Sequence, residues 1–100
     1  MLQINNLVKQ RVTQIDPGAE VILFGSRARG DFRNDSDWDF LVLLNEPPTR
    51  DIKNRILENL YDLELEYGTV ISAIIHSKSD WEALAVTPIY QIIRKEGKRA

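Results

Sequence analysis

The segment FGSRARGDFRNDSDWDF, from Phe24 to Phe40, joins two apolar runs of the sequence. Residues 21–24 are a short run of β-forming residues that ends at Gly25, which predicts a buried strand followed by a sharp turn. Residues 38–44 are again strand-like, and two prolines soon afterwards end this run because proline cannot continue a ladder. We therefore expect the segment to connect two strands and to place its polar residues between their ends.

Helical patterns lie on both sides of these strands. Apolar residues recur at helical spacing near the N-terminus, and a longer pattern of the same kind follows the two prolines. Two capping signals come later, and the polar segment between the first two strands has room for a short helical turn. The expected elements are helices from Ile4 to Ile15 and from Thr49 to Gly68, a third strand from Thr69 to Ile75, a capping box over Ser79–Glu82, and a helix that is capped by Thr87-Pro88 and ends at Gly97. Together these elements predict an α+β fold, a small mixed sheet of three to four strands flanked by helices, in a single domain over residues 1–100.

The composition limits the classes of function. With 100 residues, of which 43% are hydrophobic and 28% charged, the chain has the composition of an ordinary soluble globular protein. No apolar run is long enough to suggest a membrane span or an export signal, so we expect a cytoplasmic protein. The absence of cysteine excludes disulfides and thiolate metal sites. The net charge of -2 argues against binding to bulk nucleic acid, but it leaves room for a small anionic ligand at a local basic patch.

Two carboxylates, Asp37 and Asp39, stand one residue apart at the start of the second strand. Side chains alternate along a strand, so both acids should project from one face while Trp38 and Phe40 project from the other. Like charges roughly 6–7 Å apart repel each other, and a cation between them would relieve the repulsion. Mg²⁺ fits this pair because it takes few carboxylates and adds phosphate oxygens and water. The alternative is a solvated strand face, which is the usual meaning of an isolated Asp-x-Asp.

The other half of the segment carries groups that suit phosphate. Gly25 allows a ligand to approach the backbone closely, and the amides that follow it, with the Ser26 hydroxyl, can point at phosphate oxygens. Arg27 and Arg29 add positive charge nearby. Taken alone, a Gly-Ser after a strand is more often a simple turn, and the arginines are ordinary surface charge. Their occurrence in order with the two aspartates at one junction favours a combined phosphate and metal site.

These residues resemble a known family. The stretch GSRARGDFRNDSDWDFLV and the ending TPIYQIIRKEG are similar to minimal nucleotidyltransferases of the DNA polymerase β-like superfamily. The resemblance implies the nucleotidyltransferase fold, with Mg²⁺ held by Asp37 and Asp39 as catalytic ligands. It implies that a nucleoside triphosphate, ATP by expectation, binds at Gly25 and Ser26. It further implies that an acceptor hydroxyl attacks the α-phosphorus, that a nucleotidyl group is transferred, and that pyrophosphate leaves.

The sequence departs from the family at one position. Catalytic members resemble one another in a third carboxylate on a later strand, but the matching strand here, residues 69–75, contains no acid. Ser72 stands at about the expected place, and the nearby Glu64 and Glu66 are expected to be helix-surface groups. Slower chemistry, a carboxylate lent by a partner or substrate, and nucleotide binding without catalysis are all consistent with this difference.

The short chain also bears on the partner. It resembles stand-alone family members encoded beside HEPN-domain proteins, and this resemblance implies an antitoxin that transfers AMP to a tyrosine of the HEPN toxin. The alternatives are an enzyme that modifies antibiotics or other small molecules and a self-associating dimer. Three classes of function therefore stay open, namely a magnesium-dependent nucleotidyltransferase, a non-catalytic antitoxin or interaction module, and a nucleotide sensor.

Overall fold

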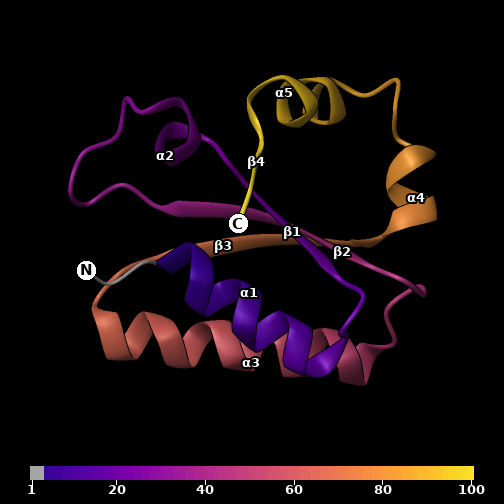
Figure 1. Ribbon diagram of the computed structural model, residues 1–100, viewed down its shortest axis with the longest axis horizontal. Coiled ribbons are helices and arrows are strands. Elements are labelled where there is room, and N and C mark those ends of the chain that lie inside the picture. The colour runs from indigo at the N-terminus through magenta and orange to yellow at the C-terminus, as the bar shows by residue number, and fades with distance from the viewer. Residues whose placement is uncertain (1–3) are drawn as a thin grey trace.

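The computed structural model describes residues 4–100, which form a four-stranded sheet with helices on both faces (Figure 1). The strand order across the sheet is β3-β2-β1-β4. The α+β fold predicted from the sequence is confirmed. In chain order the elements are α1 (Ile4–Ile15), β1 (Glu20–Phe24), α2 (Ser26–Arg29), β2 (Trp38–Leu44), α3 (Arg50–Tyr67), β3 (Ile71–Ser77), α4 (Lys78–Glu82), α5 (Pro88–Glu96) and β4 (Lys98–Arg99).

The sheet is mixed. β1 runs antiparallel to β2 and to β4, whereas β2 and β3 are parallel. Parallel neighbours need a long connection between them, and α3 supplies it. Antiparallel pairing of β1 with β2 brings the end of one strand beside the start of the other.

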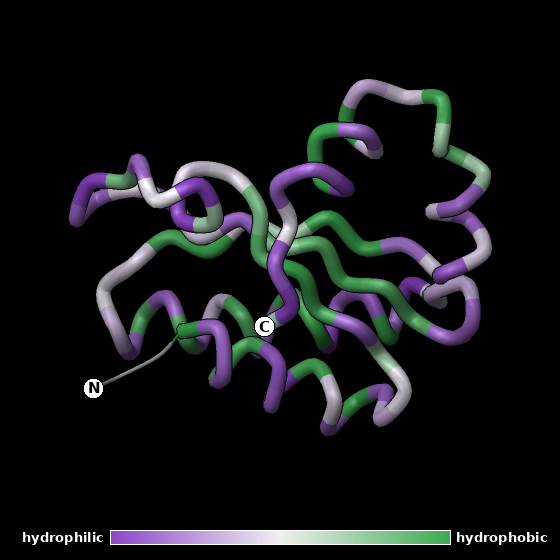
Figure 2. Tube along the Cα trace, turned by 45° about the horizontal axis from the view of Figure 1, so that its top comes forward, coloured by the Kyte–Doolittle hydropathy of each residue, from purple (hydrophilic) through white to green (hydrophobic). Residues whose placement is uncertain are grey.

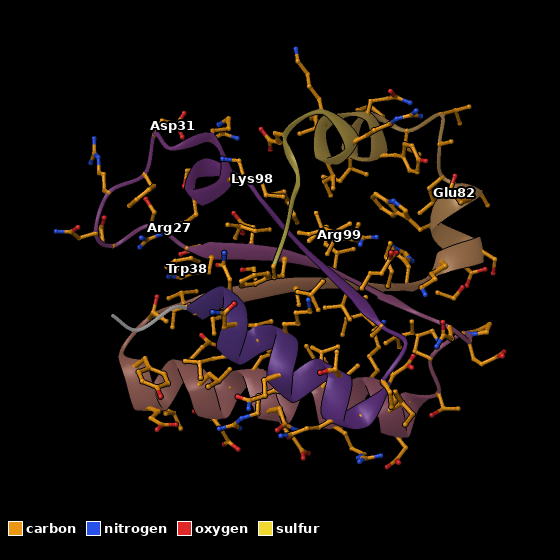
Figure 3. All side chains as sticks on the ribbon, in the orientation of Figure 1. Arg27, Asp31, Trp38, Glu82, Lys98 and Arg99 are labelled. Atoms are coloured by element: carbon orange, nitrogen blue, oxygen red, sulfur yellow. The ribbon has the colours of Figure 1, made fainter. Side chains whose placement is uncertain are left out.

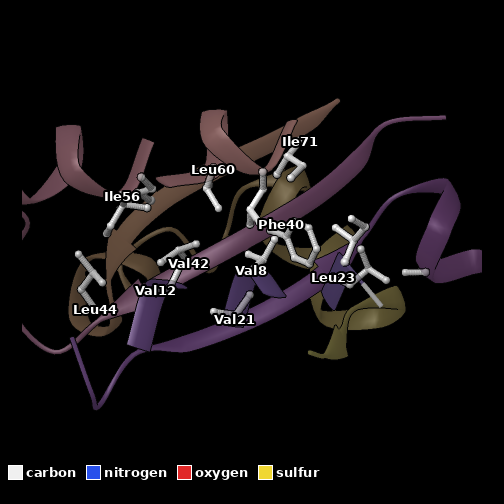
Figure 4. Close-up of a cluster of buried hydrophobic side chains, with 14 residues drawn as sticks. Val8, Val12, Val21, Leu23, Phe40, Val42, Leu44, Ile56, Leu60 and Ile71 are labelled. Atoms are coloured by element: carbon white, nitrogen blue, oxygen red, sulfur yellow. The ribbon is translucent and has the colours of Figure 1, made fainter. Parts of the chain in front are cut away.

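One face of the sheet packs against α1 and α3, which lie below the sheet in Figure 1. Figure 4 shows this core, in which Phe40 and Val42 of β2 contact residues of both helices. The helices contribute the apolar positions that the sequence periodicity indicated, among them Val8, Val12 and Ile56, and each is at most 1% exposed. This face therefore holds the main hydrophobic core.

The opposite face packs against α4 and α5 and has a smaller core. Leu41 and Leu43 of β2 point into it, together with Trp81, Tyr90 and Ile93. The rings of Trp81 and Tyr90 pack with their centroids 5.0 Å apart. Covered on both sides, β2 reads as a continuous apolar run from residue 40 onward.

Two predictions about the elements need correction, and one element was missed. The third strand begins at Ile71 and not at Thr69, because Gly68 ends α3 in a left-handed conformation at φ 63° and the N–H of Thr69 still bonds to Glu64. Ser79 does not cap α4; the cap is Ser77, whose hydroxyl accepts a hydrogen bond from the Asp80 N–H at 3.1 Å. The strand β4 was not predicted, because two charged residues carry no strand pattern.

In residues 4–100, no helix is both long and apolar enough to span a membrane.

Candidate functional site

The candidate site lies where β1 ends and β2 begins. Antiparallel register places Phe24, the last residue of β1, opposite Asp39, and the parallel pairing places Ser72 of β3 on the other side of Asp39. Asp39 shares its face of β2 with Leu41, which packs toward α4 and α5. The strand register thus brings the turn at Gly25 and the acidic residues to one end of this face.

Gly25, which directly follows β1, lies against the carboxylate of Asp39 on β2. Its backbone has φ 76° and ψ -160°, a conformation that residues with a side chain rarely adopt. A Cβ at this position would overlap Oδ2 of Asp39 and would lie 3.2 Å from the carboxyl carbon. The Asp39 carboxylate therefore rests directly against the turn that follows β1.

The electrostatics of the acid pair suit a cation. Burial raises the pKa of Asp39 above its ordinary value, and the charge of Asp37 raises it further. Arg29 lowers the pKa of Asp39, while Glu96 raises it. Asp37 itself is exposed and directly precedes β2. Ionised Asp39 thus carries an electrostatic cost that a divalent cation would remove, and carboxylate oxygens are ligands that Mg²⁺ prefers.

The acid pair alone does not complete a metal centre. Across residues 4–100, no three His, Cys, Asp or Glu side chains lie close enough together to hold an ion. Any Mg²⁺ at Asp37 and Asp39 would have to complete its shell with water or with substrate oxygens. Incomplete protein coordination of this kind is usual where magnesium is bound together with nucleotide phosphates.

The short helix α2 starts at Ser26, directly after Gly25. The buried Ala28 packs it onto the sheet, and Gly30 ends it at φ 87°. The N–H groups of Ala28 and Arg29 bond to the carbonyl of Gly25, whereas the first N–H groups of a helix have no partner inside it. Ser26 and the start of α2 therefore present hydrogen-bond donors beside Asp39.

Arg27 is engaged with the protein itself. Its guanidinium donates to the carbonyl oxygens of Asn34 and Ser36, each at 3.1 Å, and lies 4.5 Å from the ring centroid of Phe32 and 4.4 Å from that of Trp38. Figure 3 shows Arg27 and Trp38 together where this loop returns to β2, and Figure 2 shows that α2 and the loop are largely hydrophilic. These contacts hold the loop that leads to Asp37. The nucleotide-binding role of Arg27 stays a prediction, and its geometry favours a structural role.

Arg29 has an acidic partner that sequence reasoning missed. Its Nη1 donates to Oε2 of Glu96 at 3.1 Å, and its Nε donates to Asp31 at 3.2 Å. The hydrogen bond to Glu96 contributes most to raising the pKa of Arg29 and the bond to Asp31 adds to it, so Arg29 stays charged. Glu96 also accepts a hydrogen bond from the N–H of Gly25 at 3.1 Å. A lone glutamate at the end of a helix gives no signal in the sequence that it reaches a site seventy-one positions earlier.

Ser72 occupies the place on β3 where the third carboxylate was expected. It pairs with Asp39 across the sheet and is exposed on the same face, so an acid at this position would stand beside the pair. Glu64 and Glu66 lie on α3, which covers the other face of the sheet, as expected of helix-surface groups. The third acid is thus missing from β3, and Glu64 and Glu66 do not replace it.

A separate cavity of about 480 Å³ lies beneath α5. Its lining includes Ile22, Leu43, Trp81 and Arg94, but neither of the two aspartates nor Gly25. The cavity sits over the middle and far end of the sheet, so the candidate site is not part of it. The Gly25 turn and the acid pair lie at the end of the strands, outside this cavity.

Comparison with known proteins places this arrangement in a family. The sequence profile of the nucleotidyltransferase domain matches residues 4–98, which is nearly the whole chain. The chain belongs to the nucleotidyltransferase domain family. This finding confirms the resemblance inferred from the Gly25-Ser26 step and the two aspartates.

Two relatives of this nucleotidyltransferase domain come from Methanocaldococcus jannaschii. "Putative protein adenylyltransferase MJ0141" is 46% identical over 59 residues, which cover 59% of this chain and 60% of that protein. "Putative protein adenylyltransferase MJ0604" is 31% identical over 80 residues, which cover 79% of this chain and 74% of that protein. The first match thus spans less than two thirds of the relative's own length.

Solved structures share the fold of this nucleotidyltransferase domain at low sequence identity. A crystal structure of a toxin–antitoxin with AMP-PNP matches with a TM-score of 0.69 and 17% identity, covering 97% of this chain and 72% of the other. A mutant of the toxin–antitoxin MntA–HpeT matches with a TM-score of 0.67 and 15% identity, with the same two shares. These matches support the mixed sheet with flanking helices as a nucleotidyltransferase fold.

Proposed function

We propose that this chain transfers AMP from ATP to a hydroxyl group of a protein, in a reaction that depends on magnesium. The observation that carries the proposal is the Asp39 carboxylate resting against the Gly25 turn. The contact supports the proposal because a carboxylate for the cation and N–H donors for phosphate would then be within reach of one triphosphate. Family membership and the two adenylyltransferase relatives support the choice of reaction.

Each residue of the site has a part in this reaction. Asp37 and Asp39 would hold Mg²⁺, which when bound would neutralise charge on the phosphates. Gly25, Ser26 and Arg29 would hold the outer phosphates, so that the leaving pyrophosphate departs from a site that already matches its charge. The acceptor oxygen forms a bond to the α-phosphorus, the bond to the bridging oxygen of the β-phosphate breaks, and the hydroxyl proton passes to solvent or to a base on the acceptor.

The proposed acceptor is a tyrosine of a HEPN-domain toxin, with this chain as its antitoxin. Support comes from the resemblance of the sequence to stand-alone minimal nucleotidyltransferases and from the toxin–antitoxin complexes that share the fold. The test is to incubate the chain with a HEPN-domain protein encoded beside it, ATP and magnesium, and to map AMP by mass spectrometry. AMP on a tyrosine of the toxin is expected. Transfer to small hydroxyl compounds instead would redirect the proposal to a small-molecule substrate.

The catalytic pair is tested by labelled transfer. We expect the double variant Asp37→Asn with Asp39→Asn to lose transfer by at least a hundredfold, a size typical of losing metal-dependent charge stabilisation. Asp62→Asn, on the exposed surface of α3, removes a charge far from the site and should keep full activity. Equal transfer by the double variant and the wild type would reject the proposed site.

A second function is favoured by Ser72, namely nucleotide binding without turnover. Because Ser72 stands beside Asp39 where a third carboxylate was expected, the chain can retain binding and lack the group that assists the attacking hydroxyl. Calorimetry would then show magnesium-dependent ATP binding while no pyrophosphate is released. Ser72→Asp distinguishes the two functions, since a restored acid should increase transfer in a weak enzyme.

A further inference from the structure

The carboxylate of Glu96 contacts two of the groups that the proposed function assigns to phosphate, namely the N–H of Gly25 and the guanidinium of Arg29. Its Oε1 accepts from the N–H of Gly25 at 3.1 Å, and both of its oxygens lie within 3.3 Å of Nη1 of Arg29. The Glu96 side chain is 16% exposed, so these bonds are partly shielded from water. A carboxylate thus already occupies the N–H of Gly25 and the guanidinium of Arg29.

The position of Glu96 is fixed by the fold around it. It is the last residue of α5, and Gly97 follows with its N–H bonded to the carbonyl of Ile93 at 2.7 Å. β4 then pairs with β1, with Lys98 opposite Leu23. The backbone at the end of α5 is thus tied to β1, the strand that precedes Gly25, so displacement of the carboxylate would have to come from its side chain.

A triphosphate and Glu96 cannot use the same donors together. Asp39 already lies against Gly25, and Glu96 accepts from the N–H of the same residue at 3.1 Å, so two carboxylates already meet at this turn. An arriving phosphate would add further negative charge to the same turn, which is unfavourable unless Glu96 moves away.

We propose that Glu96 is an internal stand-in for phosphate, which holds the Gly25 turn and Arg29 in their binding geometry and is displaced when a triphosphate binds. The inference rests on the proposed function, because it takes Gly25 and Arg29 as phosphate donors. Glu96 is a positioning residue in the free protein and a competitor of the ligand. It therefore sets the affinity for the triphosphate without touching the reacting atoms.

Calorimetry with inorganic pyrophosphate and excess magnesium tests the competition. Glu96→Gln removes the charge and keeps the length of the side chain, and we expect it to bind pyrophosphate about tenfold more tightly, as fits the loss of a competing charge-assisted hydrogen bond. Glu96→Ala should change affinity in the same direction. The matched control is Glu66→Gln on the opposite side of the sheet, whose carboxylate also faces an arginine, at 4.0 Å, and it should bind within twofold of the wild type.

Thermal unfolding supplies the second measurement. Glu96→Gln should unfold at a lower temperature than the wild type when no ligand is present, and saturating magnesium pyrophosphate should raise its midpoint by more than it raises that of the wild type. Unchanged or weaker pyrophosphate binding by folded Glu96→Gln and Glu96→Ala, beside a wild type that binds, would overturn the inference and leave the proposed function standing. If the wild type and both variants are folded and none binds pyrophosphate or ATP, the proposed function fails and the inference with it.

Discussion

The two faces of the sheet are built for different tasks. The face toward α1 and α3 is a continuous apolar core, in which Phe40 and Leu63 are fully buried. The face toward α4 and α5 is apolar in its middle and changes at the start of β2 to Asp39, beside Gly25 and Glu96. The apolar core on the α1 and α3 side therefore supplies stability that offsets the cost of holding Asp39 and Glu96 close together on the other side.

The largest effect should come from breaking the apolar face. Phe40→Ala removes a ring with no exposed surface, and we expect a loss of about 3–5 kcal/mol in the free energy of unfolding. Leu65→Ala, at a side chain that is 66% exposed on α3, should change it by less than about 0.5 kcal/mol. Urea unfolding monitored by tryptophan fluorescence measures both. Similar losses in the two variants would mean that the stability does not reside in this core.

The second-largest effect is expected at Gly25, and a second glycine with positive φ shows how much of it comes from backbone strain alone. Gly25→Ala puts a methyl group against Asp39 in a left-handed backbone, so we expect a loss of about 1–3 kcal/mol in stability and loss of magnesium–ATP binding. Gly68→Ala is the control, because its φ of 63° is also left-handed but nothing lies within 4 Å of the added Cβ. The control should cost about 1–2 kcal/mol and keep ATP binding. Loss of binding in both variants would contradict a local role of Gly25.

A smaller effect concerns the loop that leads to the acids. Arg27→Lys keeps the charge but loses the flat guanidinium between Phe32 and Trp38 and its paired bonds to the loop carbonyls. We expect about 1 kcal/mol less stability and faster proteolysis within residues 30–37. Arg55→Lys on the exposed surface of α3 is the control. Unchanged proteolysis of the loop would show that Arg27 does not hold it.

The smallest expected effect is a change in melting temperature when the charge of Asp39 is removed. The pKa of Asp39 is raised in the folded protein, so the folded state holds this proton more firmly than the unfolded state and loses stability as the pH rises through the interval between the two pKa values. Asp39→Asn should therefore raise the melting temperature slightly at neutral pH. The gain should vanish on acidification to pH values well below the ordinary pKa of aspartate, where Asp39 is protonated in both states. A lower melting temperature at neutral pH would contradict the electrostatic cost.

Much of the fold could be predicted because the signals were local. The apolar run of β2 and the helical periodicity of α1 and α3 each depend on short-range patterns, and their positions agree with the structure to within a residue. The strand β4 was missed because its two charged residues owe their conformation to pairing with β1. β3 begins later than predicted because Gly68 and Thr69 still form the C-terminal cap of α3.

The candidate site could be predicted only in part for a related reason. Gly25 and Asp39 are linked by strand register, which sequence spacing can suggest. Glu96 reaches the same turn through packing of α5 on the sheet, and no local pattern encodes this approach. The position of Arg27 was also beyond local reasoning, because cation–π contact with two rings depends on how the loop folds back.

The hydrogen bond between Gly25 and Glu96 has a consequence for the order of folding. The first two strands can pair as a hairpin while the last helix is still being synthesised, since their contacts are close in sequence. Arg29 has Asp31 as a local partner, but it and the glycine amide gain the Glu96 carboxylate only when residues near the end of the chain have docked. A nascent chain that stops short of residue 96 would therefore display the Gly25 turn without the carboxylate that accepts its N–H in the complete fold.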